Sequence, residues 1–159
     1  MKQSTLLLIC WAFSATASPQ SITVTPGASI TIKQSQTFPN LKNSGRVVVG
    51  DSATLTLKGV SSGTGTLSVT PMSSLTTAPL STGTVYFNPT ANTIQTLSVH
   101  GTLMLGNALN IVSKTGSVRL RNGTLYADSL LTLKSDSVGT ARIDSSVGSI
   151  VGPVIVERY

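Results

Sequence analysis

Short stretches in which apolar and polar residues alternate recur along the chain. Each has a period of two, so its apolar residues lie on one side of an extended segment and its polar residues on the other. The clearest examples are residues 21–25, 29–33, 53–58, 66–70 and 117–121. We interpret these segments as β-strands with one side in a core and one side in water.

Turn-forming pairs such as Pro26-Gly27, Gly50-Asp51 and Gly106-Asn107 separate the alternating stretches. Ser and Thr make up 46 of the 159 residues, and Val, Ile and Leu dominate the apolar ones, a composition that suits pleated strands. Residues 124–138 lack Gly and Pro and could hide a helical turn, but 131–134 still alternates. We therefore predict strand there too, and an all-β fold.

A repeat along the chain separates the possible β architectures, which are a sandwich, a barrel and a solenoid. Glycines at 27, 45, 63, 83, 101, 123 and 139 are spaced 16 to 22 residues apart, close to the length of one solenoid coil. Coils that stack would bury the apolar side of each strand against the next coil. The prediction is a right-handed parallel β-helix or β-solenoid-like stack of short strands, with a Greek-key β-sandwich as the alternative.

The N-terminus has the features of a cleavable signal peptide. Met1-Lys2 gives a positive start, residues 5–13 are mostly apolar, and Ala15-Thr16-Ala17 supplies small residues for cleavage. We predict a signal peptide over 1–17, a β-solenoid-like domain over 18–159, and a secreted or cell-surface location. No stretch reaches the roughly 20 apolar residues of a membrane span, so none is expected.

Charge and chemistry exclude several functions. The net charge is +6, but the basic residues are scattered and aromatic residues are few, so we expect no nucleic-acid site. The single histidine, His100, is expected on an exposed strand face, and no Gly-x-Ser-x-Gly motif occurs. The sole cysteine, Cys10, lies in the predicted signal peptide. We predict no enzyme activity and no catalytic, cofactor or metal site.

The last third of the chain resembles a module of large secreted surface proteins of Bacteroidetes. The resemblance covers roughly residues 92–159 and rests on a leucine-rich strand with Lys-Ser-Asp at 134–136, Gly-Thr-Ala-Arg-Ile at 139–143, and the ending Gly-Pro-Val-Ile-Val-Glu-Arg-Tyr at 152–159. It implies a cargo of the type IX secretion pathway, of which this chain would be an N-terminal fragment that continues into further β-domains.

Four of the five acidic residues precede a serine. The acceptors would be Ser52, Ser129, Ser137 and Ser145; the first three resemble the Asp-Ser/Thr-aliphatic O-glycosylation signal of Bacteroidetes, and the fourth matches more loosely. Asp-Ser pairs are also good turn formers, because both side chains bond nearby backbone groups. Both interpretations remain open from the sequence.

The leading functional hypothesis is a secreted structural or adhesive surface segment that contacts an extracellular glycan or a surface protein. A carbohydrate-binding module, or the non-catalytic part of a polysaccharide-degrading enzyme, is the first alternative. It needs exposed aromatic rings, for which Tyr86 and Tyr126 are the candidates; since Tyr86 and Phe87 are adjacent on one strand, one of these two should be core. A filament subunit that assembles through strand edges is the second alternative. The oligomeric state is left open.

Overall fold

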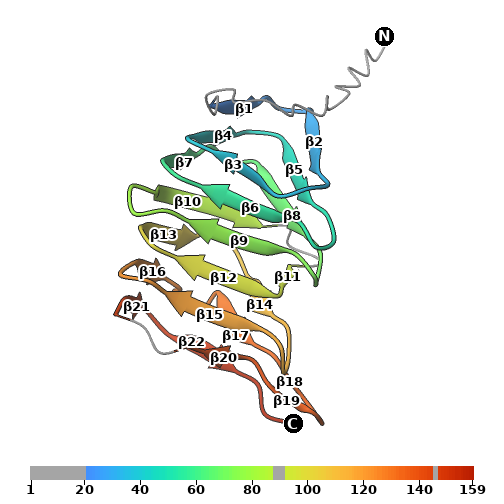
Figure 1. Cartoon of the computed structure of the whole chain (residues 1–159), viewed down its shortest axis with the longest axis vertical. Helices are drawn as coiled ribbons and strands as arrows, with labels where there is room; N and C mark the ends of the chain where they lie inside the picture. Colours follow the sequence, from blue (N-terminus) through green and yellow to red (C-terminus); the bar gives the residue numbers. More distant parts are fainter. Residues whose placement is uncertain (1–20, 88–91, 145–146) are drawn as a thin grey trace.

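The protein is a stack of short parallel strands wound into coils (Figure 1). The computed structural model describes residues 21–87, 92–144 and 147–159, which contain 22 strands and no helix. Every strand pair among them except one is parallel and joins segments about one coil apart. The predicted all-β parallel solenoid is therefore confirmed, and the Greek-key sandwich, which needs antiparallel pairing, is wrong.

The coils present three faces. Face A consists of β1 (Ile22–Val24), β4 (Leu41–Asn43), β7 (Val60–Ser62), β10 (Thr82–Phe87), β13 (Thr102–Leu105), β16 (Thr124–Tyr126) and β21 (Ser149–Val151). Face C consists of β3 (Gln36–Phe38), β6 (Thr54–Leu57), β9 (Ser74–Thr77), β12 (Thr96–Val99), β15 (Ser117–Leu120) and β20 (Arg142–Ile143).

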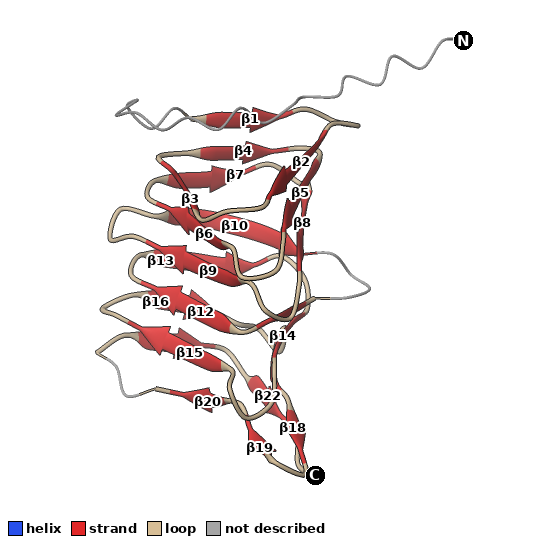
Figure 2. Ribbon diagram, turned by 45° about the vertical axis from the view of Figure 1, so that its right-hand side comes forward, coloured by secondary structure: helices blue, strands red, loops and turns tan. Residues whose placement is uncertain are grey.

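Face B is divided into two sheets. Its upper sheet holds β2 (Ser29–Ile32), β5 (Arg46–Val49), β8 (Thr66–Val69) and the second half of β10. Its lower sheet holds β11 (Thr93–Ile94), β14 (Leu109–Ile111), β17 (Leu131–Leu133) and β22 (Val154–Val156). Figure 2 shows β2, β5 and β8 above β14 and β22 on one side of the stack. The long strand β10 thus turns the corner from face A to face B.

The core fills the space enclosed by the three faces. In β6 the residues alternate between half-buried threonine and buried leucine, as a period of two requires. Leu55 pairs in register with Leu75, Leu75 with Leu97, and Leu97 with Val118, and all four are fully buried. Full burial of one such side chain stabilises the fold by roughly 1.5–3 kcal/mol, so these inward ladders hold successive coils together.

The recurring glycines mark two corners rather than one. Gly45 and Gly65 stack between faces A and B, where the amide of Thr66 donates to the Gly45 carbonyl at 2.9 Å. Gly123 and Gly148 stack between faces C and A, where a Cβ on Gly123 would lie 2.6 Å from the Val99 carbonyl oxygen. The spacing in the sequence indicated the coil length, but the single glycine series was wrong as a register because it mixed these corners with Gly83, which lies inside β10, and Gly139, which lies in β19.

Residues 124–138 form strands, as predicted, with a tight turn between β16 and β17. The turn contains Asp128 and Ser129, both with positive φ (45° and 64°). After β17 the chain forms the one antiparallel pair among the described strands, a hairpin of β18 (Ser135–Asp136) and β19 (Gly139–Thr140). The hairpin lengthens the final coil, so that Thr124 pairs with Ser149 across 25 residues, against 19 between Ile22 and Leu41.

The predicted signal peptide over 1–17 lies outside the described residues. Within the parts of the chain that the structure describes, no helix is long and apolar enough to cross a membrane.

Candidate functional site

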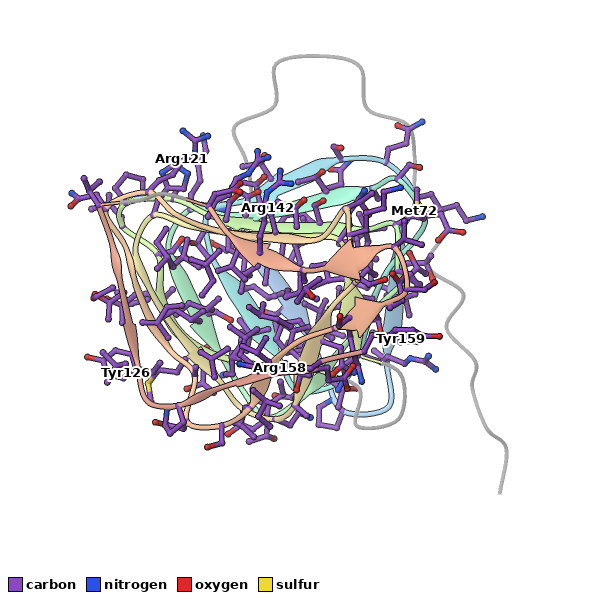
Figure 3. The ribbon with its side chains drawn as sticks, turned by 90° about the horizontal axis from the view of Figure 1, so that it is seen from below. Met72, Arg121, Tyr126, Arg142, Arg158 and Tyr159 are labelled. Carbon is purple, nitrogen blue, oxygen red and sulfur yellow. The ribbon has the colours of Figure 1, made fainter. Side chains whose placement is uncertain are left out.

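The two tyrosines expected to contact a ligand both point outward, Tyr126 from face A and Tyr86 from the corner where β10 passes from face A to face B. Tyr86 lies near the end of β10 between the buried residues Val85 and Phe87, and is itself half-buried. The expectation that one of Tyr86 and Phe87 is core is confirmed, because Phe87 is fully buried. Tyr126 ends β16 beside the fully buried Leu125 and is also half-buried. Figure 3 shows Tyr126 on the outer surface, on a different side from Arg121 and Arg142.

The ring of Tyr86 lies over the backbone of Gly106. The Gly106 amide donates to the Val85 carbonyl at 2.8 Å, which places Gly106 opposite Tyr86 in the next coil. A Cβ added at Gly106 would lie 2.6 Å from Cε1 and 2.8 Å from Cγ of the tyrosine ring. The ring therefore occupies the space that any other residue at 106 would fill.

Two apolar side chains flank Tyr126 along the stack, and Tyr86 lies two residues beyond the first member of their ladder. Thr84 pairs with Met104, Met104 with Tyr126, and Tyr126 with Val151, so all four side chains face outward in one ladder. Met104 is 42% exposed and Val151 is 41% exposed. We call Tyr86, Met104, Tyr126 and Val151 the tyrosine platform. Sequence reasoning missed Met104 and Val151; the spacing of the glycines reaches Met104, 22 residues before Tyr126, but not Val151, which lies 25 residues after it because the hairpin lengthens the final coil.

A ladder of hydroxyl groups runs beside the tyrosine platform. Thr102 pairs with Thr124, and Thr124 with Ser149. The hydroxyls of Thr124 and Ser149 lie 3.3 Å apart and share a hydrogen bond. The strands β10, β13, β16 and β21 contain no Asp, Glu, Lys or Arg. These four strands are therefore apolar and hydroxyl-bearing and carry no charge, and the exposed Asp128 lies in the turn directly after β16.

Face C differs in its outward residues. Its strands β6, β9 and β12 present hydroxyl side chains almost throughout: Thr54, Thr56, Ser74, Thr76, Thr96 and Ser98. At the C-terminal end these give way to charges, where Asp144 accepts from Nε of Arg119 at 2.8 Å and from Nε of Arg142 at 2.7 Å. The hydrogen bonds from Arg142 and then Arg119 lower the pKa of Asp144 below its ordinary value.

The carboxylate of Asp136 organises the β18–β19 hairpin. It accepts hydrogen bonds from the Ser113 hydroxyl and from the amides of Val138 (2.8 Å) and Gly139 (3.0 Å). The bond from Ser113 is the largest cause of a lowered pKa at Asp136, followed by the bond from the Val138 amide. A shallow depression lies between this hairpin and Arg158. The arrangement explains Asp136 as a turn-stabilising residue.

The predicted acceptor serines lie in turns wherever the structure describes them. Ser52, Ser129 and Ser137 are all exposed, and Ser52 and Ser129 have positive φ (62° and 64°). Ser145 lies outside the described residues. Exposure is what an attached glycan requires, and a turn is what Asp-Ser chemistry favours. O-glycosylation therefore stays a prediction at these positions.

His100 lies at the corner that follows β12, not on a strand face. It is half-buried rather than exposed as expected, and its amide donates to the Thr77 hydroxyl at 2.9 Å. In the described ranges, no group of three or more His, Cys, Asp and Glu side chains gathers where a metal ion could bind.

Comparison with protein-family models, with curated proteins and with solved structures found no match to this chain. A functional assignment therefore rests on the geometry of the three faces and on the sequence itself.

Proposed function

We propose that this protein is an exported, non-catalytic structural and adhesive segment that acts outside the cell. The single observation that carries the proposal is the uninterrupted stack of parallel strands. Face A alone aligns seven strands, which at about 4.8 Å per strand gives a rod roughly 30 Å long. Each coil is fixed to the next by backbone hydrogen bonds and a continuous apolar core, so such a rod suits a stiff spacer.

The outward residues fit a surface that contacts a partner better than a surface that is buried in a core. Hydroxyl side chains dominate faces A and C, and the apolar residues of the tyrosine platform are only half-covered. Such surfaces stay hydrated while offering many hydrogen-bond donors and acceptors to a partner. The predicted signal peptide over 1–17 and the resemblance of residues 92–159 to secreted surface modules motivate the extracellular placement.

Protease treatment of intact cells of the native host tests this proposal. A C-terminally tagged chain would be followed beside a matched chain that lacks residues 1–17. We expect the complete chain in the medium or at the surface, where protease digests it, and the shortened chain protected inside the cell. Protection of both chains, with neither in the medium, would contradict export and with it the proposed function.

A carbohydrate-binding module is a second candidate function, favoured by the placement of Tyr86 and Tyr126 along the corner of faces A and B, with Met104 in the coil between them.

A further inference from the structure

We infer that the tyrosine platform is a binding site for a neutral oligosaccharide that lies across several coils of face A, at its corner with face B. The inference rests on the proposed adhesive function and names the chemistry of the partner. Its basis is the combination, along this corner, of two outward rings, an adjustable thioether between them, a neighbouring hydroxyl ladder and strands without charged residues.

The rings present flat apolar surfaces. Tyr86 is held over the backbone of Gly106 rather than extended into water, and Tyr126 is half-buried at the end of face A strand β16. An aromatic face offers a broad apolar surface with a weakly negative π-system, and the C–H groups on one side of a sugar ring match both properties. Because Gly106 has no side chain, the Tyr86 ring can pack against its backbone.

The spacing of the rings fits an oligosaccharide rather than one sugar. Tyr126 pairs with Met104, and Met104 with Thr84, so Tyr126 is two strands from Thr84 along the stack. Tyr86 is two residues farther along β10. With about 4.8 Å between strands and 3.3 Å per residue, the two tyrosine Cα atoms lie roughly 12 Å apart. One sugar ring does not span this distance, whereas a short chain does, and flexible Met104 fills the interval.

The polar groups beside the rings suit sugar hydroxyls. Thr102 and Thr124 follow one another at the strand spacing, and each hydroxyl can donate one hydrogen bond and accept others. The four strands that carry the site have no basic residue, and Arg46, two strands from Tyr86 through Thr66, donates a hydrogen bond to the Ser68 hydroxyl. Because a polyanion needs several cations, we expect an acidic polysaccharide or a nucleic acid to bind less well than a neutral chain. The charges Arg119 and Arg142 lie instead on face C, paired with Asp144.

The test is a titration of residues 18–159 with neutral hexasaccharides of glucose, xylose and mannose, with a galacturonate hexamer as the acidic arm. Calorimetry would report affinity. Tyrosine emission would report the site, because Tyr86, Tyr126 and Tyr159 are the only tyrosines and the single tryptophan, Trp11, is in the predicted signal peptide. We expect at least one neutral hexasaccharide to bind and to change tyrosine emission, and the galacturonate hexamer not to bind.

Three variants locate the site. Tyr86→Ala and Tyr126→Ala are each expected to weaken binding roughly tenfold, the size expected for a lost aromatic contact. Gly106→Ala is the sharper variant, since it keeps both tyrosines but places a methyl group where the Tyr86 ring lies, and it should weaken binding by a similar factor. Thr56→Ala on face C is the matched control and should bind as the wild type does.

Several outcomes would overturn the inference. These are no binding of any neutral hexasaccharide, tighter binding of the galacturonate hexamer, and unchanged affinity in both tyrosine variants when circular dichroism shows that they are folded. None of these outcomes bears on export, because the protease test on intact cells measures that separately. The failure of the platform and the failure of the proposed function are thus distinguishable.

Discussion

Faces A and C both have ladders of buried apolar side chains on their inward side, and they differ in the side chains on their outward side. Leu125 of face A and Leu97 of face C are both fully buried, and each pairs in register with the strands before and after it. Outward, face C presents mostly Ser and Thr and ends in an ion-paired Asp144, whereas face A carries Tyr126 and Met104 among its threonines, with Tyr86 at its corner with face B. The difference shows that inward residues determine this fold, while outward residues are free to determine binding.

The largest expected effect is a loss of stability when a buried leucine is removed from either face. Leu97→Ala and Leu125→Ala should each lower the free energy of unfolding by about 2–5 kcal/mol, because each removes buried methyl groups and leaves a cavity. The neighbouring outward variants Thr96→Ala and Thr124→Ala should change it by no more than about 0.5 kcal/mol. Urea unfolding followed by circular dichroism gives all four values. Similar losses for inward and outward variants would show that the ladders are not what stabilises the stack.

Two glycines separate a structural corner from the binding face. A Cβ on Gly123 would lie 2.6 Å from the Val99 carbonyl oxygen, which is backbone and has little room to move. Gly123→Ala should therefore destabilise the fold by about 1–3 kcal/mol. At Gly106 the three nearest atoms all belong to the tyrosine ring, a side chain that can move, so Gly106→Ala should cost less than Gly123→Ala in the same unfolding experiment. The reverse order would mean that the Tyr86 ring is structural rather than available to a ligand.

Acid should affect face C and the hairpin more than the platform, which has no titrating carboxylate in its strands. The bonds from Arg142 and Arg119 lower the pKa of Asp144 in the folded state, below an unfolded value near 4. Because the folded pKa is the lower one, the stabilisation is complete above about pH 4 and is lost as the pH falls through the folded pKa.

Asp144→Asn should therefore flatten the decline of the unfolding midpoint below about pH 4, and Asp136→Asn should act in the same direction through the hairpin. Thermal unfolding between about pH 7 and pH 2 provides the measurement. A variant that follows the wild-type curve throughout would remove the assigned role of that carboxylate.

O-glycosylation of serines in the exposed turns is the change with the smallest expected effect on stability. If Ser52, Ser129 and Ser137 carry glycans, protein secreted by the native host will be heavier than the bare chain 18–159, and replacement of each serine by alanine will remove one increment. The intact mass of the secreted protein is the measurement. A mass equal to the bare chain would leave turn formation as the reason for these Asp-Ser pairs.

The sequence predicted the fold through inward alternation, and residues such as Leu55 and Leu75 show why. Their period of two is local, and stacking is the one arrangement that buries many such short strands in parallel. The corner at Gly123 and the one at Gly65 were harder to separate, because glycine alone does not say which strand comes next. The three-sided coil depends on strand pairing between successive coils, which local pattern does not contain.

The candidate site was predictable only in part. Tyr86 and Tyr126 stood out as aromatic residues, but Met104 belongs with them only through strand register. Gly106 carried no signal of its own, because its importance comes from the ring that lies over it. The half-burial of His100 likewise depends on the corner after β12, which the alternation of Leu97 and Val99 did not indicate.

The most direct test of the binding face is a nuclear magnetic resonance titration of residues 18–159 with the neutral hexasaccharide that binds most tightly. We expect shifts confined to face A and its corner with face B, at Tyr86, Met104, Gly106, Tyr126 and their hydroxyl neighbours, with the amides of β6 and β9 on face C unchanged. Shifts centred on face C, or spread evenly over all three faces, would contradict the proposal that the outward residues of the tyrosine platform determine binding while the inward residues determine the fold.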